Sequence, residues 1–270
     1  MRPFGSNPLG GRPGLWREAR IGLETAALLR DPVFRGDGVR DGRGQPVLLI
    51  PGFMVGDDSL GLMTRWLRRT GHHTSKAGIR LNVGCSGRGV TALEQRLEAL
   101  VQRQGRRAAI IGQSRGGSFA KVLAQLRPDL VAGIVTLGSP TVAPLKVHPV
   151  VRGGVEAVAR LGGLGAPGLF TRSCLQGDCC SDFWELHDRP HPRGIGFTAV
   201  YSRSDGIVDW RACLDKDAKH VEIRSSHIGM AVHPDGYRAI AAALDELRRR
   251  ESRSHSRSRL PARARLARAA

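Results

Sequence analysis

The sequence contains no apolar run long enough to cross a bilayer, and its first residues lack the apolar core of a signal peptide. Glycine and proline interrupt residues 1–14. We therefore expect a cytoplasmic protein, with membrane association left open. Basic residues are not interleaved with aromatic ones in the way typical of RNA-binding modules, so the body of the chain shows no sign of nucleic-acid recognition.

Cysteines are also few, and their number, five, is odd. An odd number argues against a complete disulfide framework, although one or two bridges stay open. Cys174, Cys179 and Cys180 lie close together, and His187 and His191 follow them, which invites a metal hypothesis. The Cys-x4-Cys-Cys spacing fits no common zinc pattern, so we favour buried thiols or one disulfide and expect no metal and no cofactor.

Acidic residues number 24 against 42 Lys and Arg, which gives a formal net charge of +18. Residues 248–270 hold nine arginines and one glutamate, so +10 remains for residues 1–247. The Arg/Ser-rich composition of residues 248–270 predicts a disordered tail. Electrostatic contact with an anionic membrane or nucleic acid is one interpretation of this tail, and a solvated extension is the one we favour.

The 270 residues, 41% of them hydrophobic, suffice for one α/β domain with a substantial core. Apolar patterns predict strands at 47–50, 78–82, 108–111, 131–137, 197–201 and 220–223. Helical patterns occur at 58–69, 91–104, 118–126, 150–161 and 234–247. This alternation indicates βαβ units and a mostly parallel sheet with helices on both faces.

The alternation pauses at residues 141–194, which we interpret as a cap inserted in a domain spanning residues 46–247. Residues 1–45 form an N-terminal extension, in which 14–30 suggest an amphipathic helix. We expect this helix to pack on its own domain, with a membrane surface as the alternative. Its expected apolar face consists of Leu15, Ala19, Leu23, Ala26 and Leu29.

The strongest local signal is the segment Gly-Gln-Ser-Arg-Gly-Gly at residues 112–117. It fits G-x-S-x-G, a sharp strand-to-helix turn that exposes a nucleophilic serine, here Ser114. An apolar strand precedes it and a helical pattern follows, as the motif requires. The alternative is a glycine-rich turn in which the serine caps a helix.

A catalytic triad also needs an acid and a histidine later in the chain. Asp205 and His227 each follow a predicted strand, and catalytic groups in open α/β sheets lie at the carboxyl ends of strands. His227 would act as the base, and Asp205 would hold its imidazole. Asp209 is a rival acid, whose other interpretation is the N-cap of a short helix starting at Trp210. We expect the oxyanion to be bound by the backbone N–H groups of Arg115 and Phe53.

These segments resemble the lipase and esterase branch of the α/β-hydrolase superfamily, over roughly residues 46–247. The motifs that carry the resemblance are Leu-Ile-Pro-Gly-Phe at 49–53, the segment 112–117, Thr-Leu-Gly-Ser-Pro at 136–140, Tyr-Ser-Arg-Ser-Asp-Gly-Ile-Val-Asp at 201–209 and Ser-His-Ile-Gly-Met at 226–230. The last two are similar to the acid and histidine segments of small bacterial triacylglycerol lipases. Pro51 and Gln113 stand where many relatives have histidine, which leaves the substrate open.

The resemblance implies that the protein hydrolyses carboxylic esters. We expect its partner to be a small-molecule ester that is apolar or lipid-like. We expect an apolar acyl pocket that includes Phe53, Met54, Leu169, Phe170, Phe183 and Trp184. Two alternatives stay open. An acyltransferase would use the same triad, and a non-catalytic binding protein would rely on the basic tail.

Overall fold

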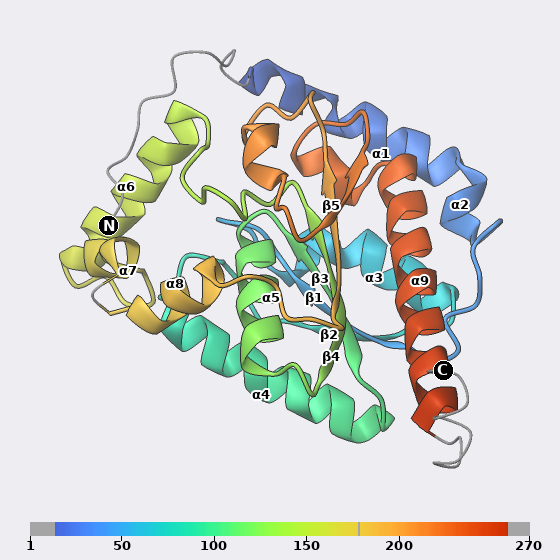
Figure 1. The fold of residues 1–270 in the computed structure, drawn as a ribbon. Coiled ribbons are helices and arrows are strands. Elements are labelled where there is room, and N and C mark those ends of the chain that lie inside the picture. The colour runs from blue at the N-terminus through green and yellow to red at the C-terminus, as the bar shows by residue number, and fades with distance from the viewer. Residues whose placement is uncertain (1–13, 178, 259–270) are drawn as a thin grey trace.

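The computed structural model describes residues 14–177 and 179–258 (Figure 1). These residues form one six-stranded sheet in the order β2-β1-β3-β4-β5-β6, with every neighbouring pair parallel, which confirms the predicted α/β class. The strands are β1 (Pro46–Ile50), β2 (His73–Lys76), β3 (Ala108–Gln113), β4 (Val131–Leu137), β5 (Gly196–Tyr201) and β6 (Lys219–Glu222).

Helices connect and flank the strands. The α-helices are α1 (Ile21–Arg30), α2 (Pro32–Arg35), α3 (Gly61–Arg69), α4 (Ser86–Gln104), α5 (Arg115–Leu126), α6 (Pro149–Gly163), α7 (Arg172–Gln176), α8 (Ser181–Asp188) and α9 (Pro234–Ser258). Short 3₁₀ helices are η1 (Leu15–Arg20), η2 (Asp57–Leu60), η3 (Trp210–Cys213) and η4 (Ile228–Ala231). None of the helices within the described residues has both the length and the apolar character to span a bilayer.

The sheet separates two apolar cores, because successive side chains of a strand point to opposite faces. On β1, Leu48 and Ile50 join the core under α4 and α5, whereas Val47 and Leu49 join the core under α3 and α9. Helices thus cover both faces of the sheet, with α4 and α5 on one side and α1, α2 and α9 on the other (Figure 1). This double burial explains why the central strands are apolar throughout.

One predicted strand is wrong. Residues 78–82 form no strand, and the edge strand β2 lies earlier, at His73–Lys76. Gly78 has φ of +75°, and the Asp57 side chain accepts the N–H groups of Gly78 and Ile79, so these backbone groups are engaged in a loop. The true strand is polar because it lies at the edge of the sheet, half-exposed, and therefore carries no apolar run.

Between β4 and β5, the described residues form α6, α7 and α8 and no strand of the sheet (Figure 1). We call residues 141–194 the cap. Its last helix, α8, packs on α5 and α4. The cap therefore lies over the helix that begins directly after Ser114.

The closing helix differs from the expectation. Instead of ending at Leu247, α9 continues to Ser258, so the predicted disorder from Arg248 onward is wrong up to that point. Ion pairs along the helix favour this extension: Arg248 binds Asp245 at 2.6 Å, and Arg107 binds the buried carboxylate of Glu251 at 3.1 Å. Residues 259–270, the rest of the predicted tail, lie outside the described residues.

The N-terminal segment folds as η1 and α1 and packs against η4 and α9. The expected apolar face is wrong, since Leu23 and Leu29 are exposed. The side chains that α1 buries are Leu28 and Glu24. A buried glutamate marks a polar contact with the domain, and that contact lies beside the candidate site.

Candidate active site

Ser114 lies in a strained turn between β3 and α5. Its φ of +51° is rare for a residue with a side chain. The turn is so tight that a Cβ on Gly112 would lie 2.4 Å from the carbonyl oxygen of Gly116, and a Cβ on Gly116 would lie 2.2 Å from that of Ile50. Both flanking positions therefore require glycine, as the G-x-S-x-G pattern predicts.

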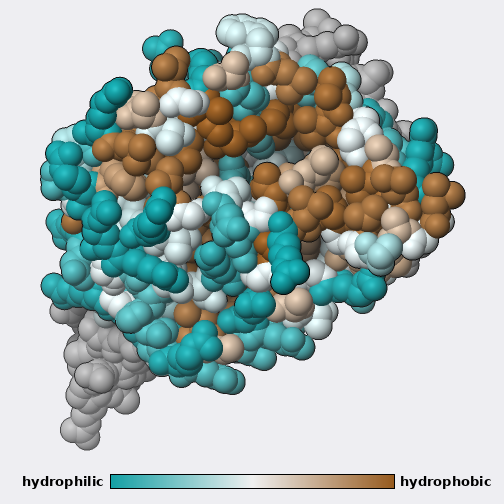
Figure 2. All heavy atoms as spheres, turned by 180° about the vertical axis from the view of Figure 1, so that it is seen from behind, coloured by the Kyte–Doolittle hydropathy of each residue, from teal (hydrophilic) through white to brown (hydrophobic). Residues whose placement is uncertain are grey.

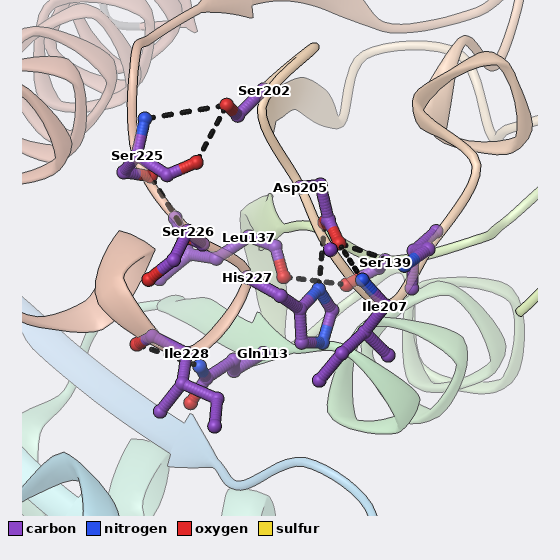
Figure 3. Close-up of polar contacts among 12 residues, drawn as sticks. Gln113, Leu137, Ser139, Ser202, Asp205, Ile207, Ser225, Ser226, His227 and Ile228 are labelled. Carbon is purple, nitrogen blue, oxygen red and sulfur yellow. Dashed lines mark hydrogen bonds and ion pairs between the residues drawn. The ribbon is translucent and has the colours of Figure 1, made fainter. Parts of the chain in front are cut away.

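Asp205 and His227 follow β5 and β6 and point toward one another (Figure 3). The Oδ2 atom of Asp205 lies 2.7 Å from Nδ1 of His227, and both residues are buried. The other carboxylate oxygen, Oδ1, accepts the N–H groups of Ile207 and Val208 at 2.8 and 2.7 Å. The carboxylate is thus fixed on both sides and holds one edge of the imidazole.

Electrostatics around His227 favour the imidazolium form. Burial opposes that charge, but the Asp205 carboxylate, through its charge and its hydrogen bond, and the nearby Glu18 carboxylate together raise the pKa of His227 above its ordinary value. A base with a raised pKa is stronger. It is therefore better able to take a proton from a hydroxyl group.

The rival acid, Asp209, lies elsewhere. Its Oδ1 accepts the N–H of Arg211 at 3.1 Å and caps η3, which is the alternative interpretation of this residue. Its side chain also pairs with the exposed guanidinium of Arg211. Of the two candidate acids, the structure brings only Asp205 to His227.

Ser114 and His227 meet at the same edge of the sheet. The Ser114 N–H donates to Leu137 at the end of β4, and a Cβ on the next residue, Gly138, would lie 2.9 Å from Nδ1 of His227. Within the described residues, no hydrogen bond joins the Ser114 hydroxyl to the imidazole. Such bonds are often long in structures without substrate and tighten when substrate binds.

The predicted oxyanion donors border the same serine. Arg115 is the first residue of α5, so its N–H is one of those that a helix leaves without an internal partner. The loop carrying Phe53 passes beside Ser114: a Cβ on Gly52 would lie 3.2 Å from the serine Cβ. In the described part of the chain, the Phe53 N–H donates to no other group.

Comparison with solved structures places this arrangement in a known fold. The chain resembles a Bacillus licheniformis lipase in its mature form, with a TM-score of 0.56 and 14% identity over 78% of this chain and 94% of that one. It also resembles the monoacylglycerol lipase of Paleococcus ferrophilus, with a TM-score of 0.54 and 15% identity over 77% and 96%. A third match is to metagenome-derived lipolytic enzymes, with a TM-score of 0.55 and 13% identity over 78% and 96%. The chain has the α/β-hydrolase fold. A scan against models of known protein families finds no match.

In this α/β-hydrolase fold, cap residues and loop and helix residues of the body line a partly open pocket with Ser114 in its wall. The space in this pocket, its open mouth included, is about 780 Å³. Phe170 of the cap, Phe183 and Trp184 of α8, and Phe53 line it, as the sequence predicts. Further apolar walls come from Pro140, Pro144, Leu145, Val147, Val151, Val155, Leu175 and Ile207. Hydrophobic side chains also gather around a hollow on the face shown in Figure 2.

Two residues predicted for the pocket do not line it. Met54 has φ of +58° and a half-exposed side chain, and its sulfur lies near α6, 3.8 Å from where a Cβ on Gly154 would stand. Leu169 packs instead against the core beneath α4 and α5. Both residues were predicted because they are apolar and lie in the cap or the loop after β1, which does not fix the direction of a side chain.

Sequence reasoning missed two polar groups that brace this site. Glu18 of η1 accepts the N–H groups of Gly206, His227 and Ile228, each at 2.9 Å. Glu24 of α1 accepts the Ser226 N–H at 2.7 Å. Neither glutamate lies in a motif, and the hydrogen-bond partners of both lie about two hundred residues later in the sequence. No local pattern therefore identifies them.

Asn82 is a third polar group that sequence reasoning missed, and it lies beside the predicted oxyanion donors. Its amide donates to the Pro51 carbonyl at 2.8 Å, while its own backbone carbonyl and Oδ1 each accept from the Arg115 guanidinium at 3.0 Å. Burial lowers the pKa of Arg115 to about 10, and the group stays charged at neutral pH. Asn82 therefore connects the Phe53 loop to the residue after the serine.

Proposed function

We propose that this protein is a serine hydrolase that cleaves carboxylic esters through an acyl-enzyme on Ser114. The observation that carries the proposal is the buried Asp205–His227 pair at the sheet edge where a strained serine borders an apolar pocket. The fold shared with lipases supports it. The fold alone does not fix a reaction.

In the first half of the reaction, the Ser114 oxygen attacks the ester carbonyl carbon while Nε2 of His227 takes the hydroxyl proton. The carbonyl oxygen becomes an oxyanion, which the N–H groups of Phe53 and Arg115 bind. Asp205 keeps the Nδ1–H of the imidazole in place and stabilises its positive charge. When the intermediate collapses, the alcohol leaves with the proton from His227, and the acyl group stays on Ser114.

In the second half, His227 takes a proton from water, and the resulting hydroxide attacks the acyl carbon. A second oxyanion forms in the same place. Its collapse returns the proton from His227 to Ser114 and releases the carboxylic acid. The same two N–H groups thus act twice.

The pocket indicates the kind of acyl group. Its walls are mostly aliphatic and aromatic, although two further serines, Arg115 and Cys174 line it beside Ser114. The apolar majority favours a hydrocarbon chain over a charged or sugar-like one. We infer an apolar or lipid-like acyl chain lying between Phe53 and the cap helices. The positions of Val151 and Val155 on α6 set how far such a chain reaches.

Fluorophosphonate labelling followed by mass spectrometry tests the mechanism. We expect one adduct on Ser114 in the native protein, no adduct in Ser114→Ala, and strongly slowed labelling in His227→Ala. Ester hydrolysis should fall on the order of 10⁶-fold in Ser114→Ala. A folded native protein that takes no label would contradict the proposal and favour a binding role. Acyl transfer to an added alcohol in preference to water would instead indicate an acyltransferase.

A further inference from the structure

Four of the five cysteines converge on one point beside the pocket. Their sulfurs all lie within 4.8 Å of one another, although Cys85 precedes α4 on the body, whereas Cys174, Cys179 and Cys180 belong to the cap. From the sequence, the candidate metal ligands are the three cap cysteines and two histidines. The structure does not bring the histidines to the cluster, because His187 pairs with Asp188 and His191 packs on Phe197.

The sulfurs form one group rather than two separate pairs. Cys179 lies 3.0 Å from Cys174 and 3.6 Å from Cys180, and Cys180 lies 3.4 Å from Cys85. Four thiolates around a tetrahedral zinc ion, with Zn–S bonds of about 2.3 Å, stand about 3.8 Å apart. The three separations given are shorter than that value, and every other pair of sulfurs lies within 4.8 Å, so small side-chain adjustments suffice to complete the tetrahedron.

The surroundings suit a thiolate cluster. Cys85 stands at the N-terminus of α4, where backbone N–H groups are available. The N-terminal end of a helix favours negative charge, which a thiolate ligand carries.

A positive charge also lies nearby. The Arg115 guanidinium is close enough to Cys174, Cys180 and Cys85 to interact with their charges. A zinc ion with four thiolates carries a net charge of −2, which this guanidinium offsets in part. Arg115 also lies over the ring of Phe170, and both residues line the pocket together with Cys174, so the cluster borders the pocket.

We propose that Cys85, Cys174, Cys179 and Cys180 bind one zinc ion that fastens the cap to the body of the hydrolase fold. Thiolates select soft or borderline metals, and a tetrahedral set of four sulfurs is typical of structural zinc. The cap helices α7 and α8 are short, with five and eight residues, so they gain more from a metal than long helices would. The evidence for this site does not rest on the chemistry proposed for Ser114.

Metal analysis of the full-length protein, purified with a phosphine reductant and without chelators, tests the proposal. We expect one zinc per chain that survives gel filtration, and loss of that zinc in Cys85→Ser and in Cys174→Ser. Cys213→Ser is the matched control, because Cys213 is buried apart from the cluster, with Tyr201 and Val208. It should keep the full zinc content.

A second measurement uses the unmodified protein and so does not depend on variants that fold poorly. A mercurial that reacts with thiolates should release one zinc ion per chain, detected with a chromogenic chelator. Cobalt substitution should give the thiolate charge-transfer band and the intense visible bands of a tetrahedral site. Iron in place of zinc, an intact mass reduced by disulfide formation, or free thiols without metal would each overturn the proposal.

Discussion

The Glu18 carboxylate accepts the backbone N–H of His227 with an O···N distance of 2.9 Å. It also accepts the N–H of Gly206, directly after the predicted acid Asp205. One residue of the N-terminal segment thus ties the acid loop to the base loop. The fit is close, since a Cβ on Gly206 would lie 2.8 Å from the same carboxylate.

Glu18→Gln should shift the pH profile of ester hydrolysis. The negative charge of Glu18 contributes to the raised pKa of His227, so its removal should lower that pKa. Hydrolysis requires the neutral imidazole, and the acid limb of kcat/KM should therefore move to lower pH. Glu246→Gln, which removes an exposed ion pair with Lys219, is the control and should leave the limb in place. An unmoved limb in Glu18→Gln would show that Glu18 has only a structural role.

The second prediction distinguishes the two candidate acids by their effect on kcat. Asp205→Asn should lower kcat by roughly 10⁴-fold, because an amide at this position favours the wrong imidazole tautomer. Asp209→Asn should change kcat only a few-fold, since Asp209 caps η3 and does not reach His227. Steady-state kinetics on a chromogenic ester compare the two variants directly. Equal losses would refute the assignment of the acid.

The sequence predicted those parts of the site that local patterns determine. The glycines around Ser114 are required by a turn of a few residues, and Asp205 and His227 each follow an apolar or edge strand. Parallel strands bring such ends together, so the position of each residue along its own strand was enough. The βαβ order followed from the same periodicity.

The rest depended on contacts between distant segments. β2 is polar because it lies at an edge, and residues 78–82 look like a strand although Asp57 holds their backbone in a loop. Glu18 is about two hundred residues from its partners, and Cys85 is 89 residues from Cys174. The sequence also did not determine the direction of each side chain: Met54, at φ of +58°, is not among the residues that line the pocket, whereas its neighbour Phe53 is.

Asn82→Ala should weaken oxyanion binding without touching the triad. The amide holds the Pro51 carbonyl and thereby positions the Phe53 N–H relative to that of Arg115. Displacing one donor costs on the order of 10²-fold in kcat, and KM should change little, because the oxyanion exists only in the transition state. Gln125→Ala removes an amide-to-carbonyl bond of similar length, 2.7 Å, at the exposed Pro190 and serves as the control. A rise in KM at constant kcat would contradict this role.

Val155→Phe should shorten the acyl chains that the protein accepts. Val155 lines the pocket from α6, so a larger side chain there takes up space that a long chain would occupy. We expect kcat/KM to fall on the order of tenfold or more for long-chain esters relative to acetate, in line with about 1–3 kcal/mol for each methylene group that no longer fits. Val150→Phe is the matched control, because Val150 lies on the same helix with 65% of its surface exposed. A series of p-nitrophenyl esters of increasing length measures both variants, and parallel profiles for the two would place the acyl chain outside this pocket.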